Sequence, residues 1–224
     1  MSIDPSFLVG QLVVEQPARA RVFEQLGIDY CCGGKISLAD VCLRDGLDLT
    51  STVAMLEAAV SADAEVESGD WAAAPLGAVC DHIVDVHHGR LRTELPRLSS
   101  LLEKVERAHA AGRPHLAHLR AAFELLRAEL EHHMEDEEEH LFPACRAGAS
   151  PDPSLCERLE EEHAASGAML ERLRGLTAGY DLDAALCNTH RATIDGLHHL
   201  EIDLHRHIHE ENNILVPRAL AHAA

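Results

Sequence analysis

Two stretches of this chain repeat one pattern of histidine, glutamate and proline, and that repeat constrains the fold more than any other feature. Residues 133–143 and 207–217 both read His-x3-Glu-x3-Leu-φ-Pro, where φ is an apolar residue. On an α-helix, a histidine and a glutamate four positions apart lie on one face, one turn from each other. A single pair of this kind is most often part of a solvated charged face. The repeat, with its shared Leu-φ-Pro, instead predicts two similar halves that each provide one histidine and one glutamate.

The composition excludes several classes of function. The chain has 224 residues, a formal net charge of −19 and only 3% aromatic residues. Such an acidic chain is a poor partner for nucleic acids and for anionic membrane surfaces, and it suits a protein that handles cations or small neutral molecules. No segment is long and apolar enough to span a bilayer, and the first ten residues have no secretory pattern. We therefore expect a cytoplasmic protein without membrane or nucleic-acid partners.

The histidines divide the chain into two parts. All 17 of them lie from His82 onward, and an acidic, polar stretch covers residues 63–70. We therefore expect a small helical module over residues 1–70 and a larger domain over residues 71–224. Seven cysteines without an export signal predict reduced thiols. Five of the cysteines lie in apolar-periodic segments, which predicts small buried hydrophobic residues at Cys42, Cys80, Cys145, Cys156 and Cys187.

The small module contains a turn with two adjacent cysteines. Its short helices are predicted within residues 5–62, with Gly27 as a stop, and Asp29-Tyr-Cys-Cys-Gly-Gly-Lys35 reads as a tight turn. Cys31 and Cys32 have three interpretations: exposed thiols with redox or metal-transfer chemistry, a strained vicinal disulfide, or plain turn residues. Residue types alone favour the last. Because neighbouring side chains usually point apart, one metal bound by both cysteines is disfavoured.

The larger domain is predicted to be an antiparallel up-down four-helix bundle, which makes the fold class all-α. Apolar periodicity and breaks predict long helices over residues 76–109, 115–140, 154–176 and 182–214. Pro96 predicts a kink or interruption in the first helix, and Phe142-Pro143 is expected to end the second. Four long helices with short connections are typical of such a bundle.

Four histidines fall at one height of this bundle. In an antiparallel pair, two residues at the same height are equally far from the connecting turn. The midpoint of His133 and His163 is residue 148, a glycine in the turn, and the midpoint of His88 and His133 falls close to Gly112. The midpoint of His163 and His207, residue 185, lies near the third connection. One level of the bundle therefore holds one histidine from each helix.

A buried cluster of four imidazoles and two carboxylates is costly unless a metal centre compensates it. Six nitrogen and oxygen ligands without thiolate suit two first-row metals with carboxylate bridges, most naturally iron. We expect His88 and His133 to bind one metal, and His163 and His207 to bind the other. Glu137 and Glu211, one turn from their histidines, are the expected bridges.

Residue types and spacing leave one ligand and the role of two nearby acids undecided. His87, or less readily His82, can replace His88, because the helix over residues 76–109 has no copy of the repeated motif. Glu129 and Glu162 lie near the predicted ligands, but a solvated surface position is favoured over a supporting role for both.

Several motifs together resemble one known family. They are Asp29-Tyr-Cys-Cys-Gly-Gly-Lys35, Ala74-Pro-Leu76, Asp81-His-Ile83, both copies of the repeat and Glu162-His163. The chain resembles, over nearly its whole length, the iron–sulfur cluster repair di-iron proteins, also called the repair-of-iron-centres family. These proteins pair a short N-terminal module with a hemerythrin-like bundle. The departures are Val216, where the family usually has phenylalanine, and the unusually acidic run over residues 135–139.

The resemblance implies a site, a cofactor and a function. The implied ligands of two non-haem irons, with oxo or hydroxo and carboxylate bridges, are His88, His133, Glu137, His163, His207 and Glu211, so His88 is preferred to His87. Cys31 and Cys32 are implied to be functional but outside the di-iron site. The implied function is a stress response that repairs iron–sulfur clusters damaged by nitric oxide or oxidants, by iron donation to the damaged proteins. A di-iron nitric oxide reductase or peroxidase, and a sensor that binds oxygen or nitric oxide, are the alternatives. A homodimer is left open.

Overall fold

The N-terminal module is a set of short helices with their own apolar core. The computed structural model describes residues 3–62 and 70–221. The helices of the module are α1 (Val9–Glu15), the short 3-10 helix η1 (Pro17–Arg19), α2 (Ala20–Leu26), α3 (Leu38–Asp45) and α4 (Leu49–Ala62). Gly27 ends α2 with a φ of 70°, a left-handed conformation that glycine adopts at no steric cost. Ser37 caps α3 by accepting a hydrogen bond from the Asp40 amide.

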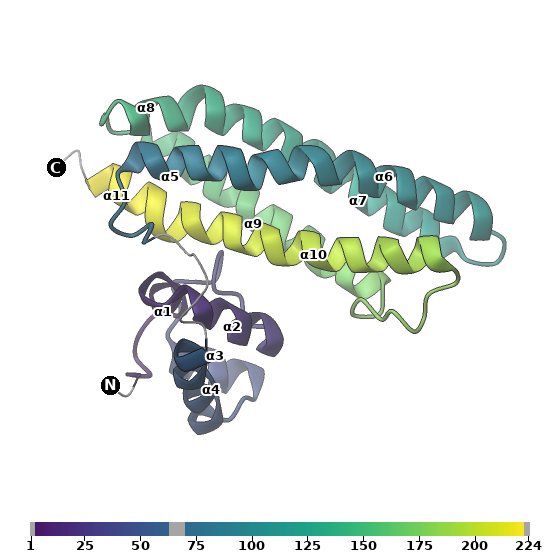
Figure 1. Cartoon of the computed structure of the whole chain (residues 1–224), viewed down its shortest axis with the longest axis horizontal. Coiled ribbons are helices and arrows are strands. Elements are labelled where there is room, and N and C mark those ends of the chain that lie inside the picture. Colours follow the sequence, from purple (N-terminus) through teal and green to yellow (C-terminus); the bar gives the residue numbers. More distant parts are fainter. Residues whose placement is uncertain (1–2, 63–69, 222–224) are drawn as a thin grey trace.

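The larger domain is the predicted four-helix bundle (Figure 1). Its helical segments are α5 (Leu76–His82), η2 (Ile83–His88), α6 (Gly89–His109), α7 (Pro114–Asp136), η3 (Glu137–Leu141), α8 (Phe142–Arg146), α9 (Pro153–Leu176), α10 (Asn188–Glu210), η4 (Glu211–Leu215) and α11 (Val216–Ala221). Three of the four long helices are therefore composite, and only α9 is a single α-helical segment. Each of α6, α7, α9 and α10 packs beside the next, and α10 returns to α6.

The segments η2, η3 and η4 are π-helical turns, and each lies at a predicted metal ligand. His88 ends η2, while Glu137 and Glu211 begin η3 and η4. Such turns are rare and occur most often at functional sites. They also correct the prediction that Phe142-Pro143 ends the second helix, because the helix continues through Pro143 in α8. The wider turn removes the clash between the proline ring and the preceding carbonyl that breaks a regular helix.

Two other boundaries differ from the prediction. Helix α6 continues through Pro96, and the irregular turn of that helix is η2 instead. Helix α10 begins at Asn188, where the Cys187 side chain accepts a hydrogen bond from a backbone amide, and not near residue 182. Cys187 is consequently exposed, contrary to expectation. The other four cysteines expected to be buried are so: Cys42, Cys80, Cys145 and Cys156.

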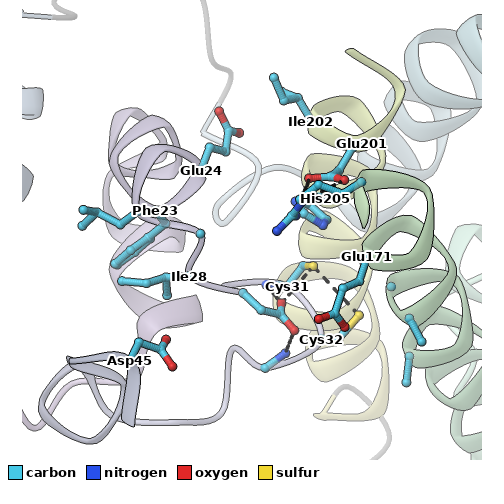
Figure 2. Close-up of a pocket in the computed structure, with 18 of the residues that line it drawn as sticks. Phe23, Glu24, Ile28, Cys31, Cys32, Asp45, Glu171, Glu201, Ile202 and His205 are labelled. Carbon is cyan, nitrogen blue, oxygen red and sulfur yellow. Dashed lines mark hydrogen bonds and ion pairs between the residues drawn. The ribbon is translucent and has the colours of Figure 1, made fainter. Parts of the chain in front are cut away.

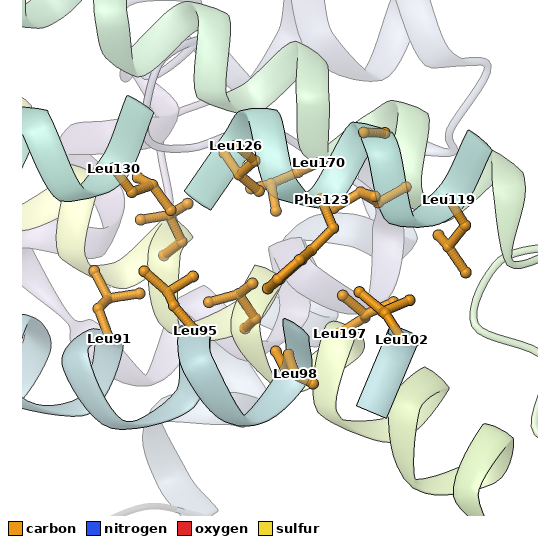
Figure 3. Close-up of a cluster of buried hydrophobic side chains, with 14 of the residues drawn as sticks. Leu91, Leu95, Leu98, Leu102, Leu119, Phe123, Leu126, Leu130, Leu170 and Leu197 are labelled. Atoms are coloured by element: carbon orange, nitrogen blue, oxygen red, sulfur yellow. The ribbon is translucent and has the colours of Figure 1, made fainter. Parts of the chain in front are cut away.

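The bundle has two apolar clusters, and the predicted ligands lie between them. The larger cluster extends from Leu91 on α6, Leu130 on α7 and Leu170 on α9 toward the far end of the bundle (Figure 3). The smaller one surrounds Phe142 and Leu215 near the other end. On every long helix the predicted ligands fall between residues of the two clusters. Apolar side chains therefore close the site from both ends of the bundle.

The N-terminal module packs against the side of the bundle formed by α9 and α10 (Figure 1). Arg206 on α10 binds Glu24 on α2 through two hydrogen bonds of 3.0 and 3.1 Å, and the Tyr30 hydroxyl donates to the same carboxylate. Most of the predicted linker, residues 63–69, lies outside the described residues, so the domain boundary at residues 70 and 71 stays a prediction. Within the described part of the chain, no helix combines the length and apolar character needed to cross a bilayer.

Candidate metal centre

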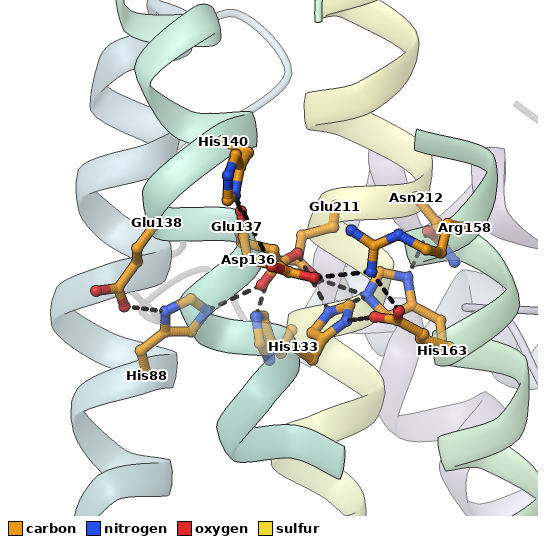
Figure 4. A network of polar contacts seen from close by, with 12 residues as sticks. His88, His133, Asp136, Glu137, Glu138, His140, Arg158, His163, Glu211 and Asn212 are labelled. Carbon is orange, nitrogen blue, oxygen red and sulfur yellow. Dashed lines mark hydrogen bonds and ion pairs between the residues drawn. The ribbon is translucent and has the colours of Figure 1, made fainter. Parts of the chain in front are cut away.

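Six side chains from all four long helices meet in the middle of the bundle (Figure 4). We call them the six-residue site: His88, His133, Glu137, His163, His207 and Glu211. Both glutamates are fully buried, and none of the four histidines is more than 4% exposed. The structure thus brings together every residue predicted as a metal ligand, at one height of the bundle.

Each glutamate faces two histidines, one with each carboxylate oxygen. Glu137 Oε2 lies 3.3 Å from His88 Nε2, and Glu137 Oε1 lies 3.2 Å from His133 Nε2. Glu211 Oε1 lies 2.9 Å from His207 Nε2, and Glu211 Oε2 lies 3.1 Å from His163 Nε2. This arrangement is typical of a carboxylate that bridges two metals.

The histidines pair differently from the prediction. His88 and His207 share one group with both glutamates, and His133 and His163 share the other. The Nε2 atoms of His133 and His163 are only 2.8 Å apart. The expected pairs, His88 with His133 and His163 with His207, were wrong because equal height does not decide which helices direct their side chains at each other.

Several inner atoms of this site lie near a histidine or glutamate but form no hydrogen bond with it. Both oxygens of Glu137, Glu211 Oε2 and His88 Nε2 are buried without a hydrogen bond. Two buried carboxylates in such surroundings would cost several kcal/mol each without compensation, on the order expected for desolvated ions. Two cations between the glutamates would satisfy these atoms, so the residues fit a di-metal centre.

Three of the histidines contact a polar side chain through Nδ1, the ring nitrogen that points away from the two buried glutamates. Glu138 Oε1 lies 2.6 Å from His88 Nδ1, Glu162 Oε2 lies 2.8 Å from His133 Nδ1, and Asn212 Oδ1 lies 2.8 Å from His163 Nδ1. Such contacts turn the ring so that Nε2 points at the metal.

The sequence predictions for these supporting residues were incomplete. Glu162 was expected to be solvated, and it instead contacts His133. Glu138 and Asn212 were not singled out, although each directly follows one of the two repeated glutamates. Their shared position in the repeat was the signal that could have found them. Glu129, the other acid considered, is exposed as expected.

The charges in the site are strongly coupled. Burial raises the pKa of Glu211, but His207 and His163 outweigh it and hold that pKa well below its usual value. Burial lowers the pKa of His133, but Glu137 and its other acidic neighbours raise it to about 10. In the absence of a cation, protonated imidazole therefore balances the carboxylates. Metal binding must displace these protons.

The cysteine turn, residues 29–35, lies against α9 and η4. Asp29 Oδ1 accepts hydrogen bonds from the Cys31 amide at 3.0 Å and from Cys31 Sγ at 3.2 Å. The two sulfur atoms are 3.9 Å apart, so the pair is reduced and both sulfurs lie on one side of the turn. Contrary to expectation, Asp29, Cys31 and Cys32 are thus close enough to offer three ligand atoms to one metal.

The two thiols differ in acidity and exposure. The contact with Cys32, together with burial, raises the pKa of Cys31 well above its usual value, and the same contact lowers the pKa of Cys32. Cys32 is half-buried, and its sulfur packs near Gly167 on α9, four residues beyond His163. Cys32 is therefore the more reactive thiol of the pair.

A cavity of about 800 Å³ opens beside the cysteine turn, between the module and the bundle (Figure 2). Cys31, Cys32 and Asp45 line it from the module, and Glu171 and His205 line it from the bundle. The half-buried Cys32 is thus accessible from this cavity, whereas Cys31 is buried behind it.

Comparisons with known proteins agree with this architecture. Residues 80–219 match the hemerythrin HHE cation binding domain, and residues 7–60 match a domain of unknown function, DUF542. The chain is 37% identical over 214 residues to the iron-sulfur cluster repair protein YtfE of Escherichia coli O81 (strain ED1a), with 95% of this chain and 96% of the relative covered. The same protein of Escherichia fergusonii is equally similar over the same length.

A four-helix bundle with two carboxylate-linked groups of histidines defines the hemerythrin-like class of metal-binding proteins. Within it, this chain belongs to the family of iron–sulfur cluster repair proteins, as the sequence motifs predicted. The cofactor of the class is a pair of non-haem irons, and the donor set and the unpartnered inner atoms described above fit it. Iron in a nitrogen and oxygen environment of this kind can alternate between ferrous and ferric states and bind a small ligand at an open position.

Proposed function

We propose that this protein repairs damaged iron–sulfur clusters by donating iron from the buried centre, with the six-residue site as its ligand set. The observation that carries the proposal is the geometry of the two glutamates. Each of them directs one carboxylate oxygen at one group of histidines and the other oxygen at the second group. The site consists of four imidazoles and two carboxylates and has no thiolate ligand. Such nitrogen and oxygen ligands suit iron that must be released again. The damaged iron–sulfur proteins are the partners, and iron is the substrate that passes to them.

Cys31 and Cys32 are proposed to receive iron, or to dock the client, at the surface. Asp29, Cys31 and Cys32 form a group of one oxygen and two sulfur donors. The half-buried Cys32, with its lowered pKa, offers a thiolate to an incoming cation. The Cys32 sulfur lies close to Gly167 on α9, one turn beyond His163, so the cysteine turn packs against a helix that carries one of the ligands.

The test is reactivation of a hydro-lyase whose [4Fe–4S] cluster has been damaged by nitric oxide. The iron-loaded protein is expected to restore its activity while losing iron in proportion. His133→Ala with His207→Ala should restore nothing, because the centre does not load. Cys31→Ser with Cys32→Ser should keep its iron but reactivate slowly, whereas Cys187→Ser, a control on an exposed cysteine of another loop, should behave as wild type.

Two results would contradict separate parts of the proposal. Reactivation without loss of iron from the protein would exclude donation. Equal rates for the double cysteine variant and wild type would exclude a role for Cys31 and Cys32. Nitric oxide or oxygen as a small ligand of the centre and a cytoplasmic location stay predictions from the sequence, and a homodimer stays an open possibility.

A further inference from the structure

A third cluster of metal-ligating side chains lies next to the six-residue site. His82 Nε2 and His87 Nε2 each lie 3.4 Å from the same oxygen, Glu210 Oε2. The ligand atoms of these three residues all lie within 4.8 Å of one another. We call this cluster the outer triad. Each of its members lies outside the ligand set, although His87 precedes His88 and Glu210 precedes Glu211 in the chain.

The distances in the outer triad do not fit ordinary hydrogen bonds. An N–H···O bond is usually 2.7–3.2 Å long, so 3.4 Å is too long for a good one. Two ligands of a tetrahedral first-row metal, each about 2.0–2.1 Å from the ion, are separated by roughly 3.3 Å. His87 Nε2 and Glu210 Oε2 are buried and have no hydrogen-bond partner. The two separations of 3.4 Å are therefore compatible with ligands of one metal ion.

The surrounding residues fix the rings in this position. Trp71 stacks on His82 with ring centres 4.1 Å apart, and Arg218 holds Trp71 through its backbone carbonyl at 2.7 Å. On the other side, the His87 ring stacks on His207 at 5.1 Å with an angle of 12° between the planes. The ion pairs of Glu210 are those with His82 and His87, and His209 is a further imidazole near its charge. Within residues 3–62 and 70–221, no lysine or arginine forms an ion pair with this carboxylate.

A cation can reach the outer triad from solvent. His82 and Glu210 line a cavity of about 460 Å³ that also borders Asp70 and Trp71, between the module and the bundle. His87 lines a second cavity of about 290 Å³ together with His207 and Asp203. The outer triad thus borders two cavities, and the second of them is also lined by His207 of the six-residue site.

We infer that His82, His87 and Glu210 form an outer metal site for a divalent first-row cation, Zn²⁺ or Fe²⁺, separate from the di-iron centre. Two imidazoles and one carboxylate are a common ligand set for such ions, and they leave a coordination position open to water or another ligand. The site stands on its own geometry and does not depend on the repair function.

The experiment is equilibrium dialysis of the iron-loaded protein against a small excess of Zn²⁺, with iron and zinc per chain measured by elemental analysis. All variants carry Cys31→Ser with Cys32→Ser, because the thiols of the cysteine turn are a second group of zinc ligands. This parent protein is expected to keep its two irons and bind one zinc. His82→Ala and Glu210→Gln should keep both irons and lose the zinc. His199→Ala is the matched control, because His199 is an exposed histidine that also has a carboxylate, Asp195, four positions away. It should bind zinc as the parent protein does.

A second measurement keeps the inference testable if a variant loses iron or fails to fold. X-ray absorption at the zinc edge of the Cys31→Ser, Cys32→Ser protein should show two imidazole ligands and at least one oxygen ligand. Three results would overturn the inference: no zinc bound by this protein with its iron in place, zinc binding that survives both His82→Ala and Glu210→Gln, or a zinc environment with fewer than two imidazoles.

Discussion

Glu138 and Asn212 each stand one residue beyond a buried glutamate, and each binds the outer nitrogen of a histidine on a neighbouring helix. Glu138 contacts His88 at 2.6 Å, and Asn212 contacts His163 at 2.8 Å. The two positions are equivalent in the repeated halves, but one residue is a carboxylate and the other a neutral amide. His88 is therefore supported by a negative charge and His163 by a neutral amide. Each of the two groups of histidines has one ring with a carboxylate behind it, Glu138 for His88 and Glu162 for His133.

Glu138→Ala should weaken iron binding by about 10- to 100-fold, the usual cost of losing a residue that orients a ligand histidine. Competition with a coloured ferrous chelator measures this change. Glu139→Ala is the control, because Glu139 is the exposed neighbour of Glu138 on the same π turn. If both variants release iron equally, Glu138 does not support His88.

Removal of the metals should destabilise the fold. The inner oxygens of Glu137 and Glu211 lose their compensation, and a ligand bound only by the folded state stabilises it by about 4 kcal/mol at a thousandfold excess over Kd. Calorimetry of the iron-loaded and chelator-treated protein should give a lower Tm for the latter. The variant His133→Ala with His207→Ala should show no difference between the two treatments, and a metal-independent Tm in wild type would exclude the linkage.

Substitutions of two adjacent leucines on α7, one buried and one exposed, test which residues belong to the core. Leu126 is fully buried, while Leu125 is 54% exposed. Leu126→Ala should lower the free energy of unfolding by about 2–5 kcal/mol through the cavity it leaves. Leu125→Ala should change it by less than about 0.5 kcal/mol. Urea unfolding of the iron-loaded variants measures both, and similar losses would contradict the assignment of the core.

Gly34→Ala should loosen the contact between the cysteine turn and the bundle. A Cβ atom at this position would lie 2.6 Å from the Tyr30 carbonyl oxygen and 2.9 Å from Asn213 Oδ1. Overpacking of this kind costs about 1–3 kcal/mol. We expect a lower Tm and faster modification of Cys31 by a thiol reagent.

The control for Gly34→Ala is Gly175→Ala on α9, where a new Cβ meets nothing within 4 Å. It should stabilise the protein by up to about 1 kcal/mol, because alanine favours helix more than glycine. Unchanged reactivity of Cys31 in Gly34→Ala would show that the turn does not depend on this close approach.

The height of the centre could be predicted from sequence because it depends only on distances along the chain. In an antiparallel bundle, the positions of Gly148 and Gly112 nearly fix which histidines are level. The pairing of His133 with His163 depends on rotation about each helix axis, and the π turns alter that rotation. Single-sequence patterns assume a constant helical period and therefore could not give it.

The start of α10 was mispredicted for a different reason. Tyr180, which has a φ of 62°, donates its hydroxyl hydrogen bond to the buried Glu201 at 2.5 Å. Glu201 in turn binds Arg174 on α9. This tertiary network holds the connection before Asn188 out of the helix, and the contact between residues 180 and 201 leaves no periodic trace in the sequence. The outer triad was missed similarly, because His82 and His87 were considered only as substitutes for His88.

The π turn η4 gives three consecutive residues three different neighbours. Glu211 faces the buried centre, Asn212 binds His163, and Asn213 donates a hydrogen bond from its side-chain Nδ2 to the Cys31 carbonyl oxygen at 3.3 Å. The iron centre and the cysteine turn are therefore joined by a single peptide segment with no intervening layer. A client protein docked at Cys31 and Cys32 would therefore contact the turn that is held by the neighbour of an iron ligand, and any shift of η4 on loss of iron would reach the docking surface directly.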